Sequence, residues 1–168
     1  MCIRDSNIRI IRSKLFKHKS FRGYKASMRR YYYGLKVQLL INKKGMPINF
    51  VFLPARVHDA RGFEQLLETL PPEAKVYADA AYNSYKIEDR LLEKHLIQLK
   101  AQRKSNSKRQ DSKQQAKLKS SMRKKVETHI SNISKYQPKS IHATSTKGFI
   151  LKVALFIYAY QVQKFLGL

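Results

Sequence analysis

The sequence predicts an α/β protein in which helices flank a mixed β-sheet, and three observations support this. Runs rich in aromatic and β-branched residues recur along the chain, as in YYYGLKVQLLIN, and favour strands. Segments with apolar residues on one helical face separate these runs. The order opens with a hairpin and continues with strand–helix–strand units, a pattern that combines antiparallel and parallel strands.

The first half of the chain predicts a hairpin and a helix. Residues 7–30 are basic and poor in periodicity, so we expect an extended segment there with a turn at Gly23. A β-hairpin follows over 31–57, because KKGMP supplies turn residues between YYYGLKVQLLIN and INFVFLPARV. HDARGFEQLLETLPPE predicts a short helix that ends at the pair Pro71-Pro72.

The second half adds further strands and helices. AKVYADAAYN and LIQLKAQ predict short strands, and SYKIEDRLLEKH between them predicts a helix with Ile87, Leu91 and Leu92 inward. The basic stretch RKSNSKRQDSKQQAKLKSSMRKK begins as a loop and becomes helical before Glu127. The last helix starts near Thr146. We expect it to be buried rather than to span a membrane, because one lysine and two glutamines interrupt its apolar run.

The composition limits the functional classes. The chain has 168 residues, enough for one domain with its own core. Its 35 Lys and Arg against 11 Asp and Glu give a net charge of +24, which favours a polyanionic partner, usually nucleic acid. On charge alone, a ribosomal-type or membrane-surface protein is the alternative. Since Cys2 is the only cysteine, the chain forms neither an internal disulfide nor a cysteine zinc site, which indicates a reducing cytoplasm.

Acidic residues are scarce, so their positions are informative. Asp79 ends a predicted strand, and ligands gather at the carboxyl ends of strands in α/β sheets, but an aspartate there equally fits the cap of a turn. Glu127 lies in a basic helix four residues after Arg123, as either a solvated ion pair or a metal ligand beside phosphate-binding cations. In a DNA-handling protein, carboxylates would repel phosphate unless a divalent cation lay between them, and magnesium binds through such oxygens.

Many segments in the right order resemble a bacterial insertion-sequence transposase of the DDE superfamily. They run from Asn7 to about Gly167 and include NIRIIRSKLF, FRGYKAS, YYYGLKVQLLIN, GMPINFVFLPARVHDARG, VYADAAYN, YKIEDRLLE, RKSNSKR, RKKVETHIS and PKSIHATSTKGFILKVALFIYA. The resemblance implies an RNase H-like fold whose two aspartates and one glutamate bind two Mg²⁺ or Mn²⁺ ions. It assigns the second aspartate to Asp79 and the glutamate to Glu127, as catalytic metal ligands.

The resemblance also implies that the partner is double-stranded DNA, both the element ends and the target. Basic side chains would contact its backbone phosphates: Arg103, Lys104, Lys108, Arg109, Arg123, Lys124 and Lys135. The family pattern has a tyrosine and a lysine where this chain has Ser120 and Ser134, and Lys135 would replace that lysine. The resemblance further implies a cytoplasmic, nucleoid-associated bacterial protein that does not use a membrane, and it is compatible with a homodimer.

The first aspartate of the triad has no clear counterpart. In such transposases it lies on the central first strand in an Asp-Ser-x-Pro segment, whereas only MCIRDS precedes Asn7 here. Asp5-Ser6 lies too close to Asn7 and lacks the proline. MCIRDS also resembles the translation of a transposon mosaic-end adapter used in sequencing libraries. We therefore expect residues 1–6 to be an adapter artefact and residues 7–168 to be a truncated catalytic domain, inactive and without its central strand. A natural N-terminus is the alternative.

Two other functions are compatible with the same residues. A non-enzymatic, basic nucleic-acid binder would leave Asp79 and Glu127 far apart, whereas convergence of the two carboxylates at one end of the sheet favours the enzyme. A metal-dependent nuclease would share the site and differ only in its products.

Overall fold

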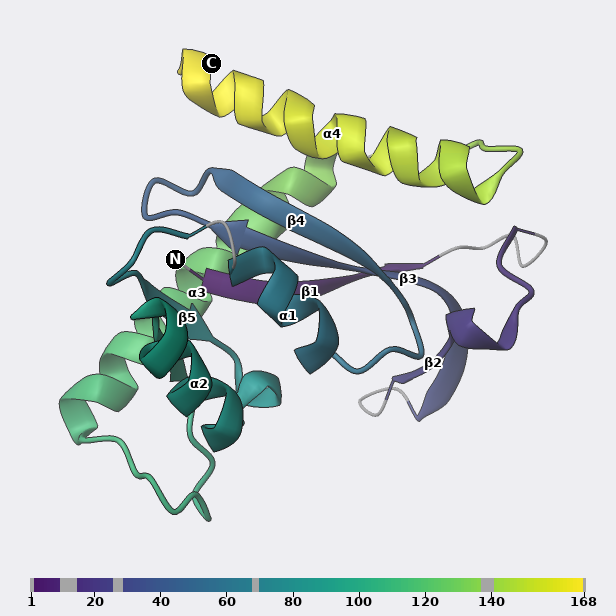
Figure 1. Ribbon diagram of the computed structural model, residues 1–168. Coiled ribbons are helices and arrows are strands. Elements are labelled where there is room, and N and C mark those ends of the chain that lie inside the picture. Colours follow the sequence, from purple (N-terminus) through teal and green to yellow (C-terminus); the bar gives the residue numbers. More distant parts are fainter. Residues whose placement is uncertain (1, 10–14, 26–28, 68–69, 137–140, 168) are drawn as a thin grey trace.

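The computed structural model describes the backbone of residues 2–9, 15–25, 29–67, 70–136 and 141–167, and their side chains except at 2–9, 25, 60–61 and 64–65. The strands are β1 (Cys2–Arg9), β2 (Arg22–Lys25), β3 (Arg30–Ile41), β4 (Pro47–Pro54), β5 (Lys75–Ala78) and β6 (Gln98–Ala101). The helices are α1 (Ala60–Leu67), α2 (Tyr85–His95), α3 (Lys113–Tyr136) and α4 (Thr146–Leu166), with short 3₁₀ turns η2 (Lys19–Phe21) and η4 (Ala80–Tyr82). Figure 1 shows the arrangement of these elements.

The described strands form one mixed sheet in the order β2-β3-β1-β5-β6, with β4 also pairing with β3. The β3–β4 hairpin is antiparallel, as predicted, while β5 is parallel to both β1 and β6. The sheet was predicted to lack its central strand, and that prediction is wrong. β1 fills the position, pairing along its whole length with β3. The physical reason is that β3 and β5 would otherwise expose unpaired backbone groups, which an extended segment satisfies.

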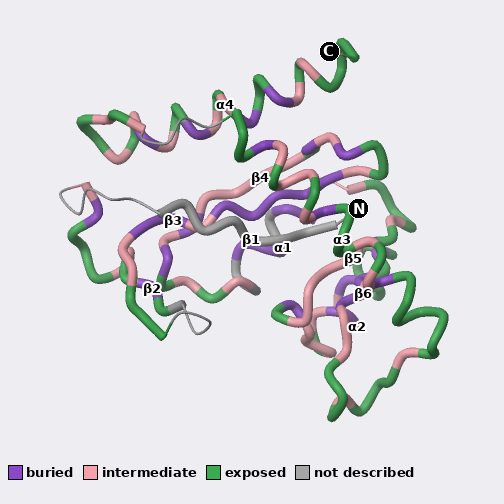
Figure 2. Tube along the Cα trace, turned by 180° about the vertical axis from the view of Figure 1, so that it is seen from behind, coloured by how far each residue is buried: buried purple, intermediate pink, exposed green. Residues whose placement is uncertain are grey.

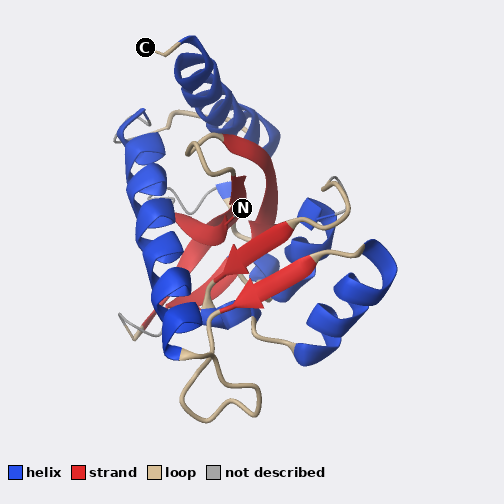
Figure 3. Cartoon of the chain, turned by 90° about the vertical axis from the view of Figure 1, so that its left-hand side faces the viewer, coloured by secondary structure: helices blue, strands red, loops and turns tan. Residues whose placement is uncertain are grey.

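Two apolar clusters cover the two faces of the sheet. Alternate residues of β3 separate them, since Val37 and Leu39 belong to one cluster and Leu40 to the other. The first cluster packs α3 and α4 on the sheet, and the second packs α1 and α2. Figure 3 shows the sheet between the long helix on one side and the shorter helices on the other. Both faces are therefore buried, as expected for a partly parallel sheet.

Helix α2 differs from its prediction in one respect. Leu91 is buried as expected, but Leu92 is 48% exposed, and Glu88 is buried in its place. The reason is an ion pair: Glu88 accepts hydrogen bonds from both terminal nitrogens of Arg103, which compensates for the burial of its charge.

Helix α4 begins at Thr146, as predicted, and the Ser145 side chain accepts a hydrogen bond from the Gly148 N–H at this start. The helix ends at Leu166, and Gly167 after it adopts the left-handed conformation. Its predicted burial is only half right, since one face packs on the sheet and the other is exposed (Figure 2). By length and composition α4 is the one helix in the described part of the chain that could cross a membrane, a test that core helices of soluble proteins also pass.

Candidate functional site

Asp79 and Glu127 converge on one cation at the carboxyl end of β5. Asp79 directly follows this strand and caps η4, with its Oδ1 accepting a hydrogen bond of 2.6 Å from the Ala80 N–H. The same oxygen lies 3.6 Å from Nη1 of Arg123. Glu127, one turn further along α3, accepts a hydrogen bond of 3.1 Å from Nε of Arg123. The two carboxylates therefore face a single guanidinium group, so the cap and the ion pair expected from local sequence both form.

Lys119 holds α3 in this position. Its ammonium group is 8% exposed and donates hydrogen bonds to the Ala101 carbonyl (2.8 Å), at the end of β6, and to both carboxylate oxygens of Asp111 (2.6 and 2.8 Å). One turn later, Nη1 of Arg123 donates to Oε1 of Gln102, which follows β6. α3 is thus attached to the ends of two parallel strands, the place where α/β sheets bind ligands.

No third acidic, histidine or cysteine side chain joins these carboxylates in the part of the chain where side chains are described. The side chain of Asp5 lies outside that part. The backbone of β1 is described, and in its antiparallel pairing with β3 Asp5 lies opposite Gln38 and Ser6 lies opposite Val37. Val37 belongs to the apolar cluster under α3, whereas Gln38 is buried on the other face, where its Nε2 donates to the hydroxyl of Tyr82.

The seven side chains predicted to bind DNA are four lysines and three arginines, of which Arg123 is described above. Four are exposed and lie in the loop after β6 or on α3: Lys104, Lys108, Lys124 and Lys135. Arg103 is different, because its side chain is 11% exposed and forms a two-pronged ion pair with Glu88. This hydrogen bonding raises the pKa of Arg103. Its geometry favours a role inside the protein rather than on DNA.

Arg109 is half exposed, and its guanidinium group already forms contacts within the protein. Its two terminal nitrogens donate to the two carboxylate oxygens of Asp89 at 2.7 and 2.9 Å, and this hydrogen bonding lowers the pKa of Asp89. The guanidinium group also lies over the ring of Tyr85, 4.7 Å from its centroid. A DNA phosphate would have to compete with these contacts for Arg109.

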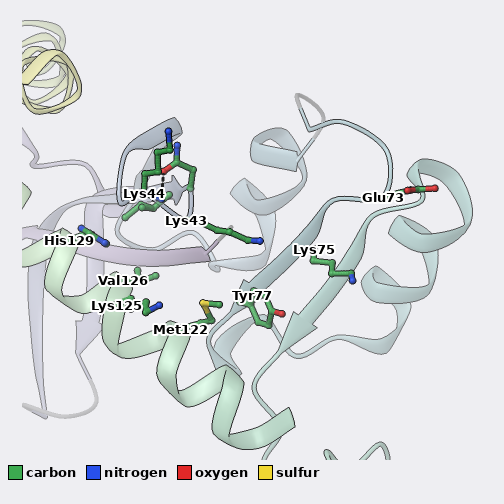
Figure 4. A pocket seen from close by; sticks show the side chains of 11 residues that line it. Lys43, Lys44, Glu73, Lys75, Tyr77, Met122, Lys125, Val126 and His129 are labelled. Atoms are coloured by element: carbon green, nitrogen blue, oxygen red, sulfur yellow. Dashed lines mark hydrogen bonds between the residues drawn. The ribbon is translucent and has the colours of Figure 1, made fainter. Parts of the chain in front are cut away.

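A cavity of 670 Å³ shares β5 and α3 with the carboxylates (Figure 4). Its floor includes Tyr77, two residues before Asp79 in the sequence, together with Met122 and Val126. Four lysines line it: Lys43, Lys44, Lys75 and Lys125. One carboxylate, that of Glu73, also lines the cavity, so its lining keeps a net positive charge that suits a polyanion.

His129 lines the same cavity from α3. Its Nδ1 is buried without a hydrogen-bond partner among the described residues. Burial lowers the pKa of His129, and the nearby ammonium groups of Lys164 and Lys125 lower it further. The ring is therefore held in its neutral form, in contact with the turn at Gly45.

Sequence analysis missed Lys119 and Asp111, which hold α3 in place at the site, and Glu88, which holds Arg103 inside the protein. One signal was present: Asp111 is the only acid in the basic stretch before α3 and had no assigned partner. Lys119 and Glu88 carried no comparable signal, because their burial depends on partners that are separated from them in the sequence and meet them only in the fold.

Comparison with known proteins decides the family. Residues 4–161 match the family model described as a transposase DDE domain. The chain belongs to this family. Membership implies the RNase H-like fold, which agrees with the mixed sheet and its flanking helices. No curated protein and no solved structure matches the chain.

This transposase-family assignment makes DNA the general class of partner and a transposase the general class of enzyme. The matched range begins at Arg4, inside the segment 1–6 that we expect to be foreign. The domain boundary between residues 6 and 7 stays a prediction, as do the roles of the individual site residues.

Proposed function

We propose that the site of this DDE transposase domain supports metal-dependent hydrolysis of a phosphodiester at insertion-sequence ends and transfer of the freed 3′ strand to target DNA. One observation carries the proposal: Asp79 and Glu127, from a strand end and a helix 48 positions apart in the sequence, meet at one cation. A non-enzymatic binder gives no reason for two carboxylates to converge in a chain with so few acids.

The residues fit the Mg²⁺ or Mn²⁺ ions that the family implies. Both side chains offer carboxylate oxygens, the ligands that these hard cations prefer. The guanidinium of Arg123 already occupies the space between them and is a stand-in for a cation. When bound, such ions activate a water molecule or a 3′-hydroxyl and stabilise the leaving oxygen. Because the sequence has no Asp-Ser-x-Pro segment to supply the first aspartate of the family triad, we propose that the chain as it stands binds metal weakly and is inactive.

The other residues of the site orient DNA. If a metal takes its place, Arg123 becomes available to bind a phosphate through two parallel N–H donors. Lys124 extends the positive surface along α3, and the lysines around the cavity extend it toward the β3–β4 turn. Lys104, Lys108 and Lys135 complete the proposed phosphate contacts, and Arg109 joins them only by releasing Asp89. We place the protein in the bacterial cytoplasm, on nucleoid DNA.

The experiment is a titration of the full chain with Mn²⁺, followed by electron paramagnetic resonance of the free ion. Asp79→Asn and Glu127→Gln should each weaken binding by about tenfold, since each removes one of two charged ligands. Glu93→Gln, on the exposed surface of α2, is the matched control and should leave the Kd unchanged. Equal affinities in all four proteins would remove the basis of the proposal.

DNA binding supplies a second test. Lys124→Ala should weaken binding to DNA of any sequence and lower the slope of log K against log salt by about one. Lys94→Ala, on α2, is the control that removes the same charge elsewhere. If both variants have the same effect, the DNA does not lie along α3. Products distinguish the nuclease alternative, because only a transposase joins a 3′ end to a second DNA molecule.

The origin of residues 1–6 has its own test. We propose that they derive from an adapter, and reading the source DNA upstream of the Asn7 codon decides it. An Asp-Ser-x-Pro segment in frame would support the proposal and supply the third carboxylate. Genomic MCIRDS would refute it.

A further inference from the structure

A pair of exposed tyrosines lies on the ribbon that β2 forms with the start of β3. Tyr24 of β2 lies directly opposite Tyr31 of β3, and the centroids of their rings are 5.0 Å apart. Both face solvent, since Tyr24 is 55% exposed and Tyr31 is 60% exposed. Figure 1 shows β2 at the end of the molecule away from α2 and β5. A cross-strand contact covers only part of each ring, so the remaining ring surface is available to a partner.

The two faces of this ribbon differ. A Cβ built on Gly23 would lie 2.9 Å from both the Tyr32 ring and the Cβ of Ala55, so the face of Tyr32 is packed against the chain after β4. Residues that are opposite one another in an antiparallel pair share a face, and successive residues alternate between faces. The open face therefore carries Arg22, Tyr24 and Tyr31.

An arginine already stacks on one of these rings. The guanidinium carbon of Arg22 lies 4.1 Å from the centroid of the Tyr31 ring, within the range of a cation–π contact. Arg22 is itself exposed. Aromatic rings and guanidinium planes are the protein groups on which unpaired bases of nucleic acids stack. The guanidinium group can also donate hydrogen bonds to the phosphate beside a stacked base.

The charge of the surrounding sequence matches an anionic partner. No aspartate or glutamate occurs between Ser6 and His58, whereas this range contains 13 lysines and arginines. Two of them, Arg29 and Arg30, are exposed and directly precede Tyr31. The patch therefore favours a partner that combines negative charge with flat aromatic surface.

We propose that Arg22, Tyr24 and Tyr31 form a platform that binds the unpaired bases of a single DNA strand. Stacking accepts any base, because every base has a π-face, and the neighbouring arginines would hold the phosphates. A duplex keeps its bases paired and stacked inside, so the platform would engage DNA only where the two strands have separated. The inference goes beyond the proposed function, since it needs neither the carboxylates nor a metal, and two strands of the sheet separate β2 from β5.

A membrane surface fits this patch less well. Among the side chains described in 15–24 and 29–47, the exposed large apolar ones are Tyr24 and Tyr31. Segments that bind at the membrane interface bury a larger apolar face, with leucine, phenylalanine or tryptophan below the headgroups. Two tyrosines without an exposed aliphatic neighbour in these ranges offer little area for that purpose.

The test is fluorescence anisotropy of the full chain with a labelled oligothymidine of about 12 nucleotides, a length within the range of known single-strand sites. An abasic oligonucleotide of the same length keeps the phosphates and lacks the bases, so the wild-type chain should bind it more weakly. Tyr24→Ala and Tyr31→Ala should each weaken binding of the oligothymidine by about 5- to 150-fold, the loss of one stacked base. Their affinity for the abasic oligonucleotide and their slope of log K against log salt should stay unchanged, because no charge is removed.

Two variants serve as controls. Tyr31→Phe keeps the aromatic ring and should bind like the wild-type chain. Phe165→Ala removes an 81%-exposed ring from α4 and should leave the affinity for oligothymidine unchanged. If one alanine variant fails to fold by circular dichroism, Tyr31→Leu, which keeps an apolar side chain without a ring, decides by the same criterion.

Equal affinity of the wild-type chain for the oligothymidine and the abasic oligonucleotide overturns the proposal, and so does equal weakening by Tyr31→Ala and Phe165→Ala. Tighter binding of an oligouridine RNA than of the oligothymidine would overturn the assignment to DNA. Flotation with phosphatidylserine vesicles that is lost in Tyr31→Ala, without any preference for bases, would assign the patch to a membrane surface instead. None of these outcomes depends on the affinity for Mn²⁺, which tests the proposed chemistry separately.

Discussion

Replacement of Arg123 by alanine should make the proposed metal site stronger, not weaker. The guanidinium lies 3.6 Å from Asp79 and 3.1 Å from Glu127, and any metal ion must displace it. The three side chains are 46%, 30% and 41% exposed, so solvent screens both ion pairs. Exposed pairs contribute about 0.2–1 kcal/mol each, and two of them about 0.4–2 kcal/mol. Removal of this competition should lower the Kd for Mn²⁺ by about 2- to 30-fold.

Mn²⁺ titration of the full chain measures this change. Arg123→Lys keeps the positive charge and should stay close to wild type. Lys124→Ala removes a neighbouring charge of α3 that forms neither ion pair, and its effect should be smaller. The free energy of unfolding of Arg123→Ala should fall by no more than about 1–2 kcal/mol. If Arg123→Ala binds Mn²⁺ no more tightly than Lys124→Ala, the guanidinium group of Arg123 does not compete with a metal ion for the two carboxylates.

Three further predictions concern the surrounding structure. Glu88→Ala strands the buried guanidinium of Arg103 and should cost about 3 kcal/mol or more in urea unfolding. The folded pKa of His129 lies below its unfolded value of 6.5, so the unfolded chain binds more protons and stability should fall as pH drops below 6.5; in His129→Gln this pH dependence should weaken. Gly45→Ala should cost about 1–3 kcal/mol, because Gly45 has φ of +82° and a Cβ there would lie 2.0 Å from Cε1 of His129.

Each of these has a comparison that isolates its cause. Asp89→Asn breaks a solvent-exposed pair with Arg109 and should cost far less than Glu88→Ala, so similar losses would contradict the burial argument. His95→Gln replaces an exposed histidine and should leave the slope below pH 6.5 in place. Gly148→Ala lies in a helix, 3.2 Å from the nearest side-chain atom, and should be tolerated.

The helices and strands that were predicted correctly are those indicated by residues within the same short segment of the sequence. The hairpin followed from a turn between two β-rich runs, and the start of α4 near Thr146 was also predicted from the sequence. The convergence of Asp79 and Glu127 was expected from family resemblance together with the position of an aspartate after a strand.

The features that sequence analysis missed depend on partners distant in the chain. Glu88 is buried only because Arg103, 15 positions later, satisfies its charge, and helical periodicity instead favoured Leu92 as an inward residue. The outer face of α4 was predicted to be buried because apolar residues occur all around the helix. The sequence alone does not show that the rest of the protein packs against only one of its faces. β1 was missed because its eight residues form a strand only between β3 and β5.

When the 168-residue chain is expressed as it stands, with residues 1–6 included, the central position of β1 has a consequence for its synthesis. β1 ends at Arg9, whereas its parallel neighbour β5 is complete only at Ala78. A ribosome adding about 5–20 residues per second needs roughly 3–14 s to cover that distance. Throughout that interval the nascent chain can pair β1 on one side only, so its other side is open to any strand nearby. Slow elongation between the hairpin and β5 therefore lengthens the time in which neighbouring nascent chains on one messenger RNA can pair wrongly.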